Sequence, residues 1–241
     1  MNMSERTMKK ECVETVSVIQ LDRSMTAEER ISSLLSEHTL KIYINGCLTW
    51  EVVCVAEHLI ELVFGRLLTE RRIQGIRDIE SVSICESGER ADVVLKNRGS
   101  DVSFLPSSRI APIAWKPEWI FRLEEEFAMD TPLHRQTSST HSCFLALKGE
   151  ILVQCEDIGR HNAMDKVIGY GLRYGVDLGQ SMVYSSGRVP TDMAVKAIHA
   201  GIPVLASKES PTLEAVKLAK QYCLTLLCNA KGGKFCQYTR F

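Results

Sequence analysis

The second half of the chain alternates between strand-like and helix-like segments, and this alternation limits the fold more than any other feature. Helical stretches separate four short apolar runs: ILVQC (151–155), MVYS (182–185), IPVLAS (202–207) and LTLLC (224–228). Parallel strands need crossover connections of about a dozen residues or more, and helices usually supply them. We therefore predict an α/β domain with a largely parallel sheet covered by helices on both faces. One further hairpin is expected ahead of it, turning at Lys148-Gly149.

The first half, up to about residue 97, is typical of antiparallel sheet with one helix. TLKIYI (39–44) and CLTWEVVCV (47–55) flank Asn45-Gly46, a dipeptide that favours a type I′ hairpin turn. A second hairpin is expected over 79–96, and AEHLIELVFGRLL (56–68) has helical spacing between the two. The predicted division is a lead-in (1–38), a β-rich N-terminal subdomain with a mobile linker (39–116) and an α/β cofactor-binding domain (117–241).

Charge and hydropathy exclude several classes of partner. The formal net charge is −1, so the chain lacks the basic excess of a duplex-binding protein, and we expect no nucleic acid partner. No apolar run approaches the ~18 residues of a membrane span, so no membrane partner is expected. The N-terminal residues lack the apolar core of a secretory signal, which predicts a cytoplasmic protein.

The nine cysteines form no CxxC pair. Without that spacing a zinc knuckle is not expected, and we predict no metal site. An odd number of cysteines in a chain without a signal peptide indicates reduced thiols. Cys143 follows His141 by two residues, and this pair is the one candidate for a Cys/His nucleophile.

Polar residues concentrate where the predicted strands of the second half end. EDIGRH (156–161) follows the first strand, SSGR (185–188) the second, KESPT (208–212) the third and NAKGGK (229–234) the fourth. Ligands of open α/β sheets bind beyond the carboxyl ends of the strands. We expect the first three of these loops at one edge of the sheet, each leading into a helix.

The residue types in these loops favour a phosphorylated ligand. Arg160 and Arg188 can bind an anion through paired hydrogen bonds, and glycines let backbone amides approach phosphate closely. Helix N-termini also favour negative charge. The predicted binding residues are Arg160, His161, Asn162, Asp165, Gly187, Arg188, Asn229, Ala230, Lys231, Gly232, Gly233 and Lys234.

A structural interpretation stays open at the same positions. Asp157 or Asp165 can pair with Arg160 or Lys166 in an ion network that holds the fold and binds nothing. His161 can equally be a hydrogen-bonded core histidine.

Several stretches resemble a known family. EDIGRHNAMDKVIG (156–169) resembles the most recognisable motif of the formate dehydrogenase accessory sulfurtransferases, the FdhD family. SGRVPTDMAVKAIHAGIPVLASKESPTLEAVKLAKQYCLTL (186–226) continues the match without a gap. SSTHSCFLAL (138–147) and LVFGRLLTERRIQGIRDI (62–79) resemble two further stretches of that family.

The resemblance implies a fold and a role. The fold would be a cytidine-deaminase-like layered α/β core with a smaller β-rich N-terminal subdomain, in a homodimer. Members carry sulfur, as a persulfide, from a cysteine desulfurase to the molybdenum or tungsten bis(molybdopterin guanine dinucleotide) cofactor of formate dehydrogenase. The segment 229–234 would bind that cofactor, and GDP-like nucleotides would mimic it.

The chain departs from the family at the position of its persulfide-carrying CxxC. The corresponding stretch reads LPSSRIAPIAW (105–115), with Arg109 and Pro112 where the cysteines should stand. A thiolate is the nucleophile of persulfide chemistry, so neither residue can carry sulfur. Two hypotheses follow. The first is a formate dehydrogenase accessory protein that binds the cofactor and assists its sulfuration or insertion; in one variant of it another thiol, with Cys143 beside His141 as the candidate, replaces the pair. The second is a non-catalytic paralogue that binds a nucleotide or a partner protein.

Overall fold

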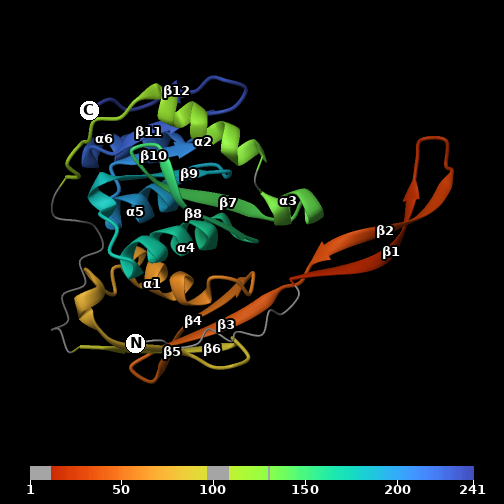
Figure 1. The fold of residues 1–241 in the computed structure, drawn as a ribbon, viewed down its shortest axis with the longest axis horizontal. Coiled ribbons are helices and arrows are strands. Elements are labelled where there is room, and N and C mark those ends of the chain that lie inside the picture. The colour runs from red at the N-terminus through yellow and green to blue at the C-terminus, as the bar shows by residue number, and fades with distance from the viewer. Residues whose placement is uncertain (1–11, 97–108, 130) are drawn as a thin grey trace.

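The computed structural model describes residues 12–96, 109–129 and 131–241. Its elements form successive layers, which Figure 1 shows from top to bottom. Helix α2 (Pro117–Met129) covers one face of a six-stranded sheet, and α4 (Arg160–Arg173), α5 (Thr191–His199) and α6 (Leu213–Tyr222) cover the other. Helix α1 (Leu59–Thr69) lies between α4 and a second, four-stranded sheet. The predicted α/β core with a smaller β-rich N-terminal part is confirmed.

The six-stranded sheet is mixed, which corrects the expectation of a largely parallel one. Its order is β12-β11-β10-β9-β7-β8, and only the β9–β10 and β10–β11 pairings are parallel. β7 is antiparallel to both of its neighbours. A two-residue turn with positive φ at Lys148 and Gly149 joins it to β8. The strands are β7 (His141–Leu147), β8 (Glu150–Asp157), β9 (Ser181–Ser185), β10 (Val204–Ser207), β11 (Thr225–Cys228) and β12 (Cys236–Gln237).

Strand direction matters more for function than the pairing of neighbours. β8 is antiparallel to β7 and β7 is antiparallel to β9, so β8 points the same way as β9, β10 and β11. The carboxyl ends of these four strands therefore meet at one edge of the sheet. The fourth loop, 229–234, lies at this edge with the other three, whereas the sequence led us to place only three there.

The four-stranded sheet, of order β4-β3-β6-β5, agrees with the two predicted hairpins. Asn45 and Gly46 have φ of 49° and 81°, as a type I′ turn requires. Its inward side chains pack on α1. The strands are β3 (His38–Ile44), β4 (Cys47–Cys54), β5 (Ile79–Ile84) and β6 (Arg90–Leu95); short helices η1 (Ile76–Asp78), η2 (Leu178–Gln180) and α3 (Pro132–Thr137) complete the described part.

Helices α1 and α4 join the two halves through a glycine-mediated contact. A Cβ added to Gly65 would lie 1.8 Å from the backbone oxygen of Asp165, and one added to Gly169 would lie 1.8 Å from that of Glu61. Only glycine permits such close approach of two helix backbones.

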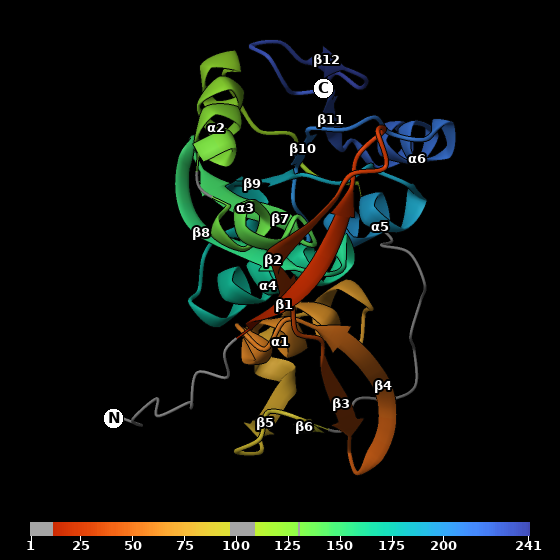
Figure 2. The same ribbon diagram turned by 90° about the vertical axis from the view of Figure 1, so that its right-hand side faces the viewer.

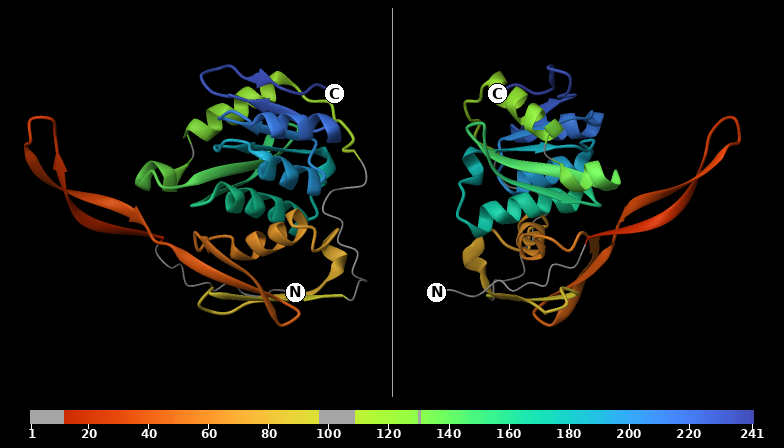
Figure 3. Two further views of the ribbon diagram at one scale, coloured as in Figure 1. Left: turned by 180° about the vertical axis from the view of Figure 1, so that it is seen from behind. Right: turned by 45° about the vertical axis from the view of Figure 1, so that its right-hand side comes forward.

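An antiparallel arm projects from the body of the molecule. It consists of β1 (Val13–Leu21) and β2 (Ala27–Leu35), within the segment we treated as a lead-in. Figures 2 and 3 show the ribbon leaving the body next to β3, with only its base near α3. Local pattern did not reveal it, because its strands mix charged and apolar residues on both faces.

Residues 12–96, 109–129 and 131–241 lack two features. No helix there is long and apolar enough to cross a membrane. Nor do three His, Cys, Asp or Glu side chains gather there in a group that could hold a metal ion.

Candidate functional site

Much of the polar chemistry of EDIGRHNAMDKVIG faces the interior. Lys166 and Asp157 are fully buried, and Lys166 Nζ lies 2.6 Å from Asp157 Oδ2. The same ammonium donates to the carbonyl oxygens of Val55 and Glu156. Asp157 also accepts from the backbone N–H of Val55 at 3.1 Å. This ion pair therefore holds the end of β8 and the end of β4 together.

A second buried network centres on Asp165, whose side chain is fully buried. Its carboxylate lies 2.8 Å from Arg66 Nε, and Lys196 Nζ donates to both of its oxygens. The Thr69 hydroxyl donates to it at 2.7 Å. Asp165 thus binds α1, α4 and α5 together, as the structural interpretation of the sequence allowed.

Asn162 belongs to the same interior. Its amide nitrogen donates to Val53 O and to Asp157 Oδ1, and its amide oxygen accepts from Arg66. With only 6% of its surface exposed, it holds the loop in place. Of the predicted binding residues on α4, Asn162 and Asp165 therefore face the subdomain junction, and Arg160 and His161 face the sheet edge.

Basic side chains gather at the edge of the sheet formed by the carboxyl ends of β8, β9, β10 and β11. His141 opens β7, Arg160 opens α4, and Arg188 follows β9. Burial lowers the pKa of His141, and the neighbouring charges of Arg160, His134, His161 and Arg188 lower it further. The two arginines are charged at any ordinary pH and repel a protonated His141 ring. An anion bound here would relieve that repulsion.

Arg160 has an incomplete set of partners. Its Nε is buried and has no hydrogen-bond partner, although buried donors are normally satisfied. Its aliphatic stem packs on Gly187, where an added Cβ would lie 2.8 Å from Arg160 Cδ. The glycine therefore creates the space in which the stem of Arg160 lies. His161 is better satisfied, since its Nε2 lies 2.7 Å from Asp192 Oδ2.

Ser186 connects the edge to β7, a contact the sequence did not indicate. Its hydroxyl accepts from the backbone N–H of Ser142 at 3.0 Å and lies 3.1 Å from His141 Nδ1. The next loop is tied in through Ser207, whose hydroxyl donates to Gly187 O at 2.6 Å. These bonds hold the loops after β9 and β10 in fixed register.

The 229–234 loop attaches to the same edge. The N–H of Ala230 donates to Ser207 O, and the Tyr184 hydroxyl donates to Ala230 O at 2.6 Å. Asn229 accepts from the Ser210 hydroxyl and donates to Tyr238. The base of the loop is thus bonded on both sides.

The tip of the loop already holds an anionic group. Gly232 and Gly233, with φ of 64° and 71°, point their backbone N–H groups at the Glu124 carboxylate of α2, at 2.7 and 3.2 Å. Consecutive amides of this kind form an anion-binding nest. Lys231 lies 3.3 Å from Glu209, and Lys234 is exposed.

Comparison with known proteins places the chain in a family. The model of the FdhD/NarQ family matches residues 35–106 and 100–241. The chain belongs to the FdhD/NarQ family. The sulfur carrier protein FdhD of Listeria monocytogenes is 30% identical, with 90% of this chain and 93% of that protein covered. That of Wolinella succinogenes is 27% identical, with 99% and 90% covered.

A solved structure supports the same assignment. A crystal structure from Desulfotalea psychrophila, named as a candidate formate dehydrogenase accessory protein, superposes with a TM-score of 0.83 at 25% identity. The superposition covers 95% of this chain and 97% of that one. The fold therefore matches along nearly the whole length, not in one subdomain alone.

Cys143 does not fit the persulfide chemistry that the sequence suggested for this FdhD/NarQ member. It is fully buried on β7, and burial raises the pKa of its thiol to about 12. A reactive thiol needs exposure and a lowered pKa. We predicted activation by His141, but His141 contacts Ser186 instead. Arg109 and Pro112, at the position of the family's cysteines, are exposed, and residues 105–108 lie outside the described ranges.

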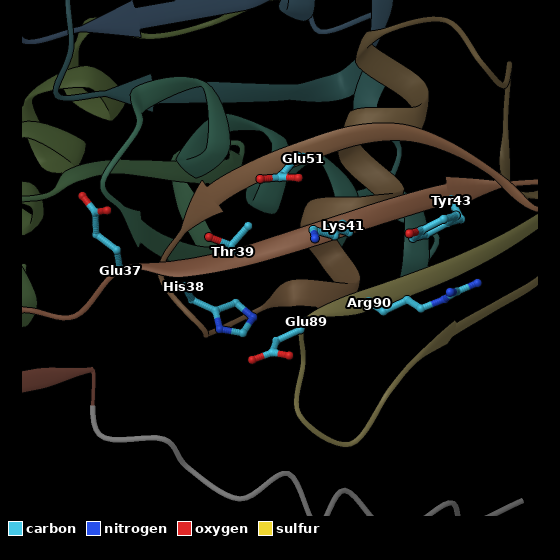
Figure 4. Close-up of a pocket in the computed structure, with 8 residues that line it drawn as sticks. All are labelled: Glu37, His38, Thr39, Lys41, Tyr43, Glu51, Glu89 and Arg90. Atoms are coloured by element: carbon cyan, nitrogen blue, oxygen red, sulfur yellow. The ribbon is translucent and has the colours of Figure 1, made fainter.

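A hollow in the described part lies away from these loops. It has a volume of about 480 Å³ and opens on the outer face of the four-stranded sheet, away from the strand ends (Figure 4). Its charges are mixed, and Arg90 is already paired with Asp92 at 2.7 Å and placed over the Tyr43 ring. Because no group in it lacks a partner in the way Arg160 does, we assign the candidate site to the sheet edge.

Proposed function

We propose that this protein is an accessory protein of formate dehydrogenase that binds the guanine-dinucleotide form of the molybdenum or tungsten cofactor. Relatives named sulfur carrier protein FdhD and a structural neighbour named for formate dehydrogenase support the role. The single observation that carries the site is the cationic edge, where Arg160 has a buried donor without a partner. A ligand with several phosphates supplies the negative charge that this edge lacks.

Different residues at the sheet edge would have different roles in ligand binding. Arg160 and Arg188 would hold phosphate oxygens through guanidinium forks, while Lys231 and Lys234 would neutralise charge from the opposite side. Gly187 leaves room for the aliphatic stem of Arg160. His161 is oriented by Asp192 and would donate or accept at the rim.

The cofactor is the cargo of the proposed reaction. Sulfur would pass from a cysteine desulfurase to this chain and then to the bound cofactor, before the cofactor enters formate dehydrogenase in the cytoplasm. A homodimer is also proposed, for which one face of the protruding arm offers the exposed apolar side chains of Ile19, Leu21 and Ile31. The thiol that carries sulfur must be accessible, so it is not Cys143.

Calorimetric titration with GDP tests the binding site. The wild-type chain should bind, and Arg160→Met should weaken binding about ten-fold or more, because a charge-assisted hydrogen bond is worth about 1.5–3 kcal/mol. Arg122→Met is the matched control, since Arg122 is exposed and paired with Glu150. Equal affinity for all three proteins, or no binding by any, would overturn the proposed site.

The absence of the CxxC pair favours a second candidate, a paralogue that binds a nucleotide or partner without moving sulfur. Formate dehydrogenase activity in a bacterial strain lacking its own accessory protein separates the two. Rescue by this chain supports the accessory role. No rescue by a soluble chain that still binds GDP supports the binding-only paralogue.

A further inference from the structure

Cys228 and Cys236 lie directly opposite each other in the sheet. They are register partners in the antiparallel pairing of β11 with β12, so their side chains leave the same face. Opposed residues of such a pair have Cα atoms about 4.5–5.5 Å apart. A disulfide needs a Cα separation of about 4.4–6.8 Å. The backbone therefore already permits a bond between these two sulfurs.

The two thiols differ in their environment. Cys228 is fully buried, and burial raises the pKa of its thiol to about 12. Cys236 lies on the edge strand and is exposed. Both are free thiols in this structure. A partner protein can reach Cys236 directly, while Cys228 is shielded behind it.

The pair closes the base of the candidate ligand loop. Residues 229–234 connect the two strands, and this loop contacts Tyr184, Glu209 and Glu124 at the cationic edge. A sulfur on Cys236 would therefore lie on β12, the strand that directly follows the loop proposed to hold the cofactor.

No other exposed cysteine in the described ranges has these properties. Cys47 is opposite Ile44, and Cys85 contacts Ser87. Both belong to the four-stranded subdomain, on the far side of α1 from the six-stranded sheet (Figure 1). Both are exposed and serve as controls. A side-chain hydrogen bond with Ser87 lowers the pKa of the Cys85 thiol, so Cys85 tests whether a reactive thiol far from the six-stranded sheet accepts sulfur instead.

We propose that Cys236 is the sulfur-accepting thiol of this protein and that Cys228 is its partner thiol, together replacing the missing CxxC. The proposal rests on the proposed function, because it assumes that sulfur is carried at all. The substrate class is a protein persulfide, as formed on a cysteine desulfurase.

Loading and release can be written as balanced steps. The Cys236 thiolate attacks the terminal sulfur of the donor persulfide, the donor S–S bond breaks, and the donor leaves as a thiolate. In release, the two-residue edge strand β12 must first separate from β11, because Cys228 is buried while the strands are paired. Cys228 then loses its proton to solvent, and its sulfur attacks Sγ of the Cys236 persulfide. A Cys228–Cys236 disulfide forms, and the terminal sulfur leaves as hydrosulfide. Oxidation of the two cysteines to the disulfide supplies the two electrons that reduce this sulfur. A dithiol reductant then restores both cysteines.

Incubation of the purified full-length chain with a cysteine desulfurase and L-cysteine tests the loading step. Intact-mass analysis should show one added sulfur, and peptide mapping should place it on Cys236. Cys236→Ser should abolish the added mass, while Cys47→Ser and Cys85→Ser should keep it. Cys236 is exposed and serine has nearly the same shape, so the fold is expected to persist. Sulfur on another cysteine, or undiminished loading of Cys236→Ser, overturns the proposal.

Oxidation with diamide tests the pairing without any partner protein. A non-reducing peptide map should contain the Cys228–Cys236 disulfide, and Cys228→Ser should remove it. Loaded Cys228→Ser should also keep its persulfide longer than the wild-type chain, because the attacking thiol is gone. Failure to form this disulfide while other cysteines cross-link contradicts the pairing.

The rescue assay separates failure of this proposal from failure of the proposed function. If the wild-type chain rescues formate dehydrogenase and Cys236→Ser rescues equally well, the accessory role stands and Cys236 is not the carrier. If the wild-type chain gives no rescue although it binds GDP, the accessory role itself has failed.

Discussion

At the scale of single residues, burial separates structural charges from those available to a ligand. Lys166 and Asp157 are both fully buried and bonded to each other, so neither can meet a phosphate. Arg160, a few residues away on the same motif, keeps an unsatisfied buried donor at the sheet edge. The motif therefore serves two purposes, holding the subdomain junction and presenting a cation.

Replacing Lys166 by methionine tests the structural purpose. It would leave Asp157 charged and buried without its partner, which costs about 3–5 kcal/mol. Urea unfolding should show this loss in the free energy of unfolding. Arg122→Met breaks the exposed Arg122–Glu150 pair and should cost less than about 1 kcal/mol. A similar effect of both substitutions would contradict the distinction.

His141 should respond to pH and to ligand. Its pKa is lowered in the folded protein by burial and by neighbouring cations, so the unfolded chain binds the proton more tightly. The contribution of His141 to the free energy of unfolding therefore falls as pH drops below about 6.5, the usual histidine pKa. A bound polyanion favours the protonated ring. NMR titration should find the pKa of His141 lowered in the free protein and raised by GDP, and no rise on GDP binding would place the phosphates elsewhere.

At the scale of elements, glycine decides how α1 and α4 meet. Gly169→Ala would bring a methyl group into the backbone of Glu61 and should destabilise the protein by about 3 kcal/mol or more. Gly75 has an extended backbone with open space around its Cα, so Gly75→Ala is the control and should change little. Thermal unfolding of both variants measures the difference. Equal melting temperatures of the Gly169→Ala and Gly75→Ala variants would show that α1 and α4 can move apart without loss of stability.

Helix α2 and the 229–234 loop interact through Glu124. Its carboxylate fills the nest formed by the N–H groups of Gly232 and Gly233, and a phosphate there must displace it. Glu124→Gln weakens that internal contact, because a neutral acceptor bonds amides less strongly than a carboxylate does. GDP affinity should therefore rise several-fold, whereas the exposed neighbour substitution Glu125→Gln should leave it unchanged. A loss of affinity in Glu124→Gln would mean that Glu124 helps to bind the ligand.

At the scale of the whole molecule, the β1–β2 arm has the least packing against the rest of the chain. Isolated two-stranded ribbons are marginally stable in water. One face of this ribbon carries Ile19, Leu21 and Ile31, which are 72%, 59% and 80% exposed. A face about 30 Å long and about 10 Å wide offers about 300 Å². In a dimer, the face of each arm would cover an equal area on the other copy, so the two arms together would bury about 1,200 Å². This area is at the lower end of specific interfaces.

The proposed homodimer should therefore depend on this face. Ile31→Lys places a charge within it and should shift the chain from dimer to monomer in sedimentation experiments. Arg30→Ala alters the opposite face of the ribbon and should leave the dimer intact. A dimer that survives Ile31→Lys unchanged would show that the arm is not its contact.

Outside the β1–β2 arm, local sequence pattern determined the main strands and helices of this protein, because turns and periodicity depend on neighbours in the chain. Asn45-Gly46 and Lys148-Gly149 adopt the positive φ that their hairpins need, and the helices that begin at Thr191 and Leu213 follow their predicted strands. The sequence also shows the concentration of polar residues after Cys155. These residues belong partly to the junction between the two subdomains and partly to the sheet edge.

Only the tertiary structure decided which polar side chains face inward and which segments meet. Strand order is set by long-range pairing, so the place of β7 between β8 and β9, and of the 229–234 loop beside the others, could not be read locally. The direction of Asp165 depends on where α1 packs, and the opposition of Cys228 and Cys236 depends on the register of β11 with β12. Packing and register act between residues distant in sequence, and no short motif encodes them.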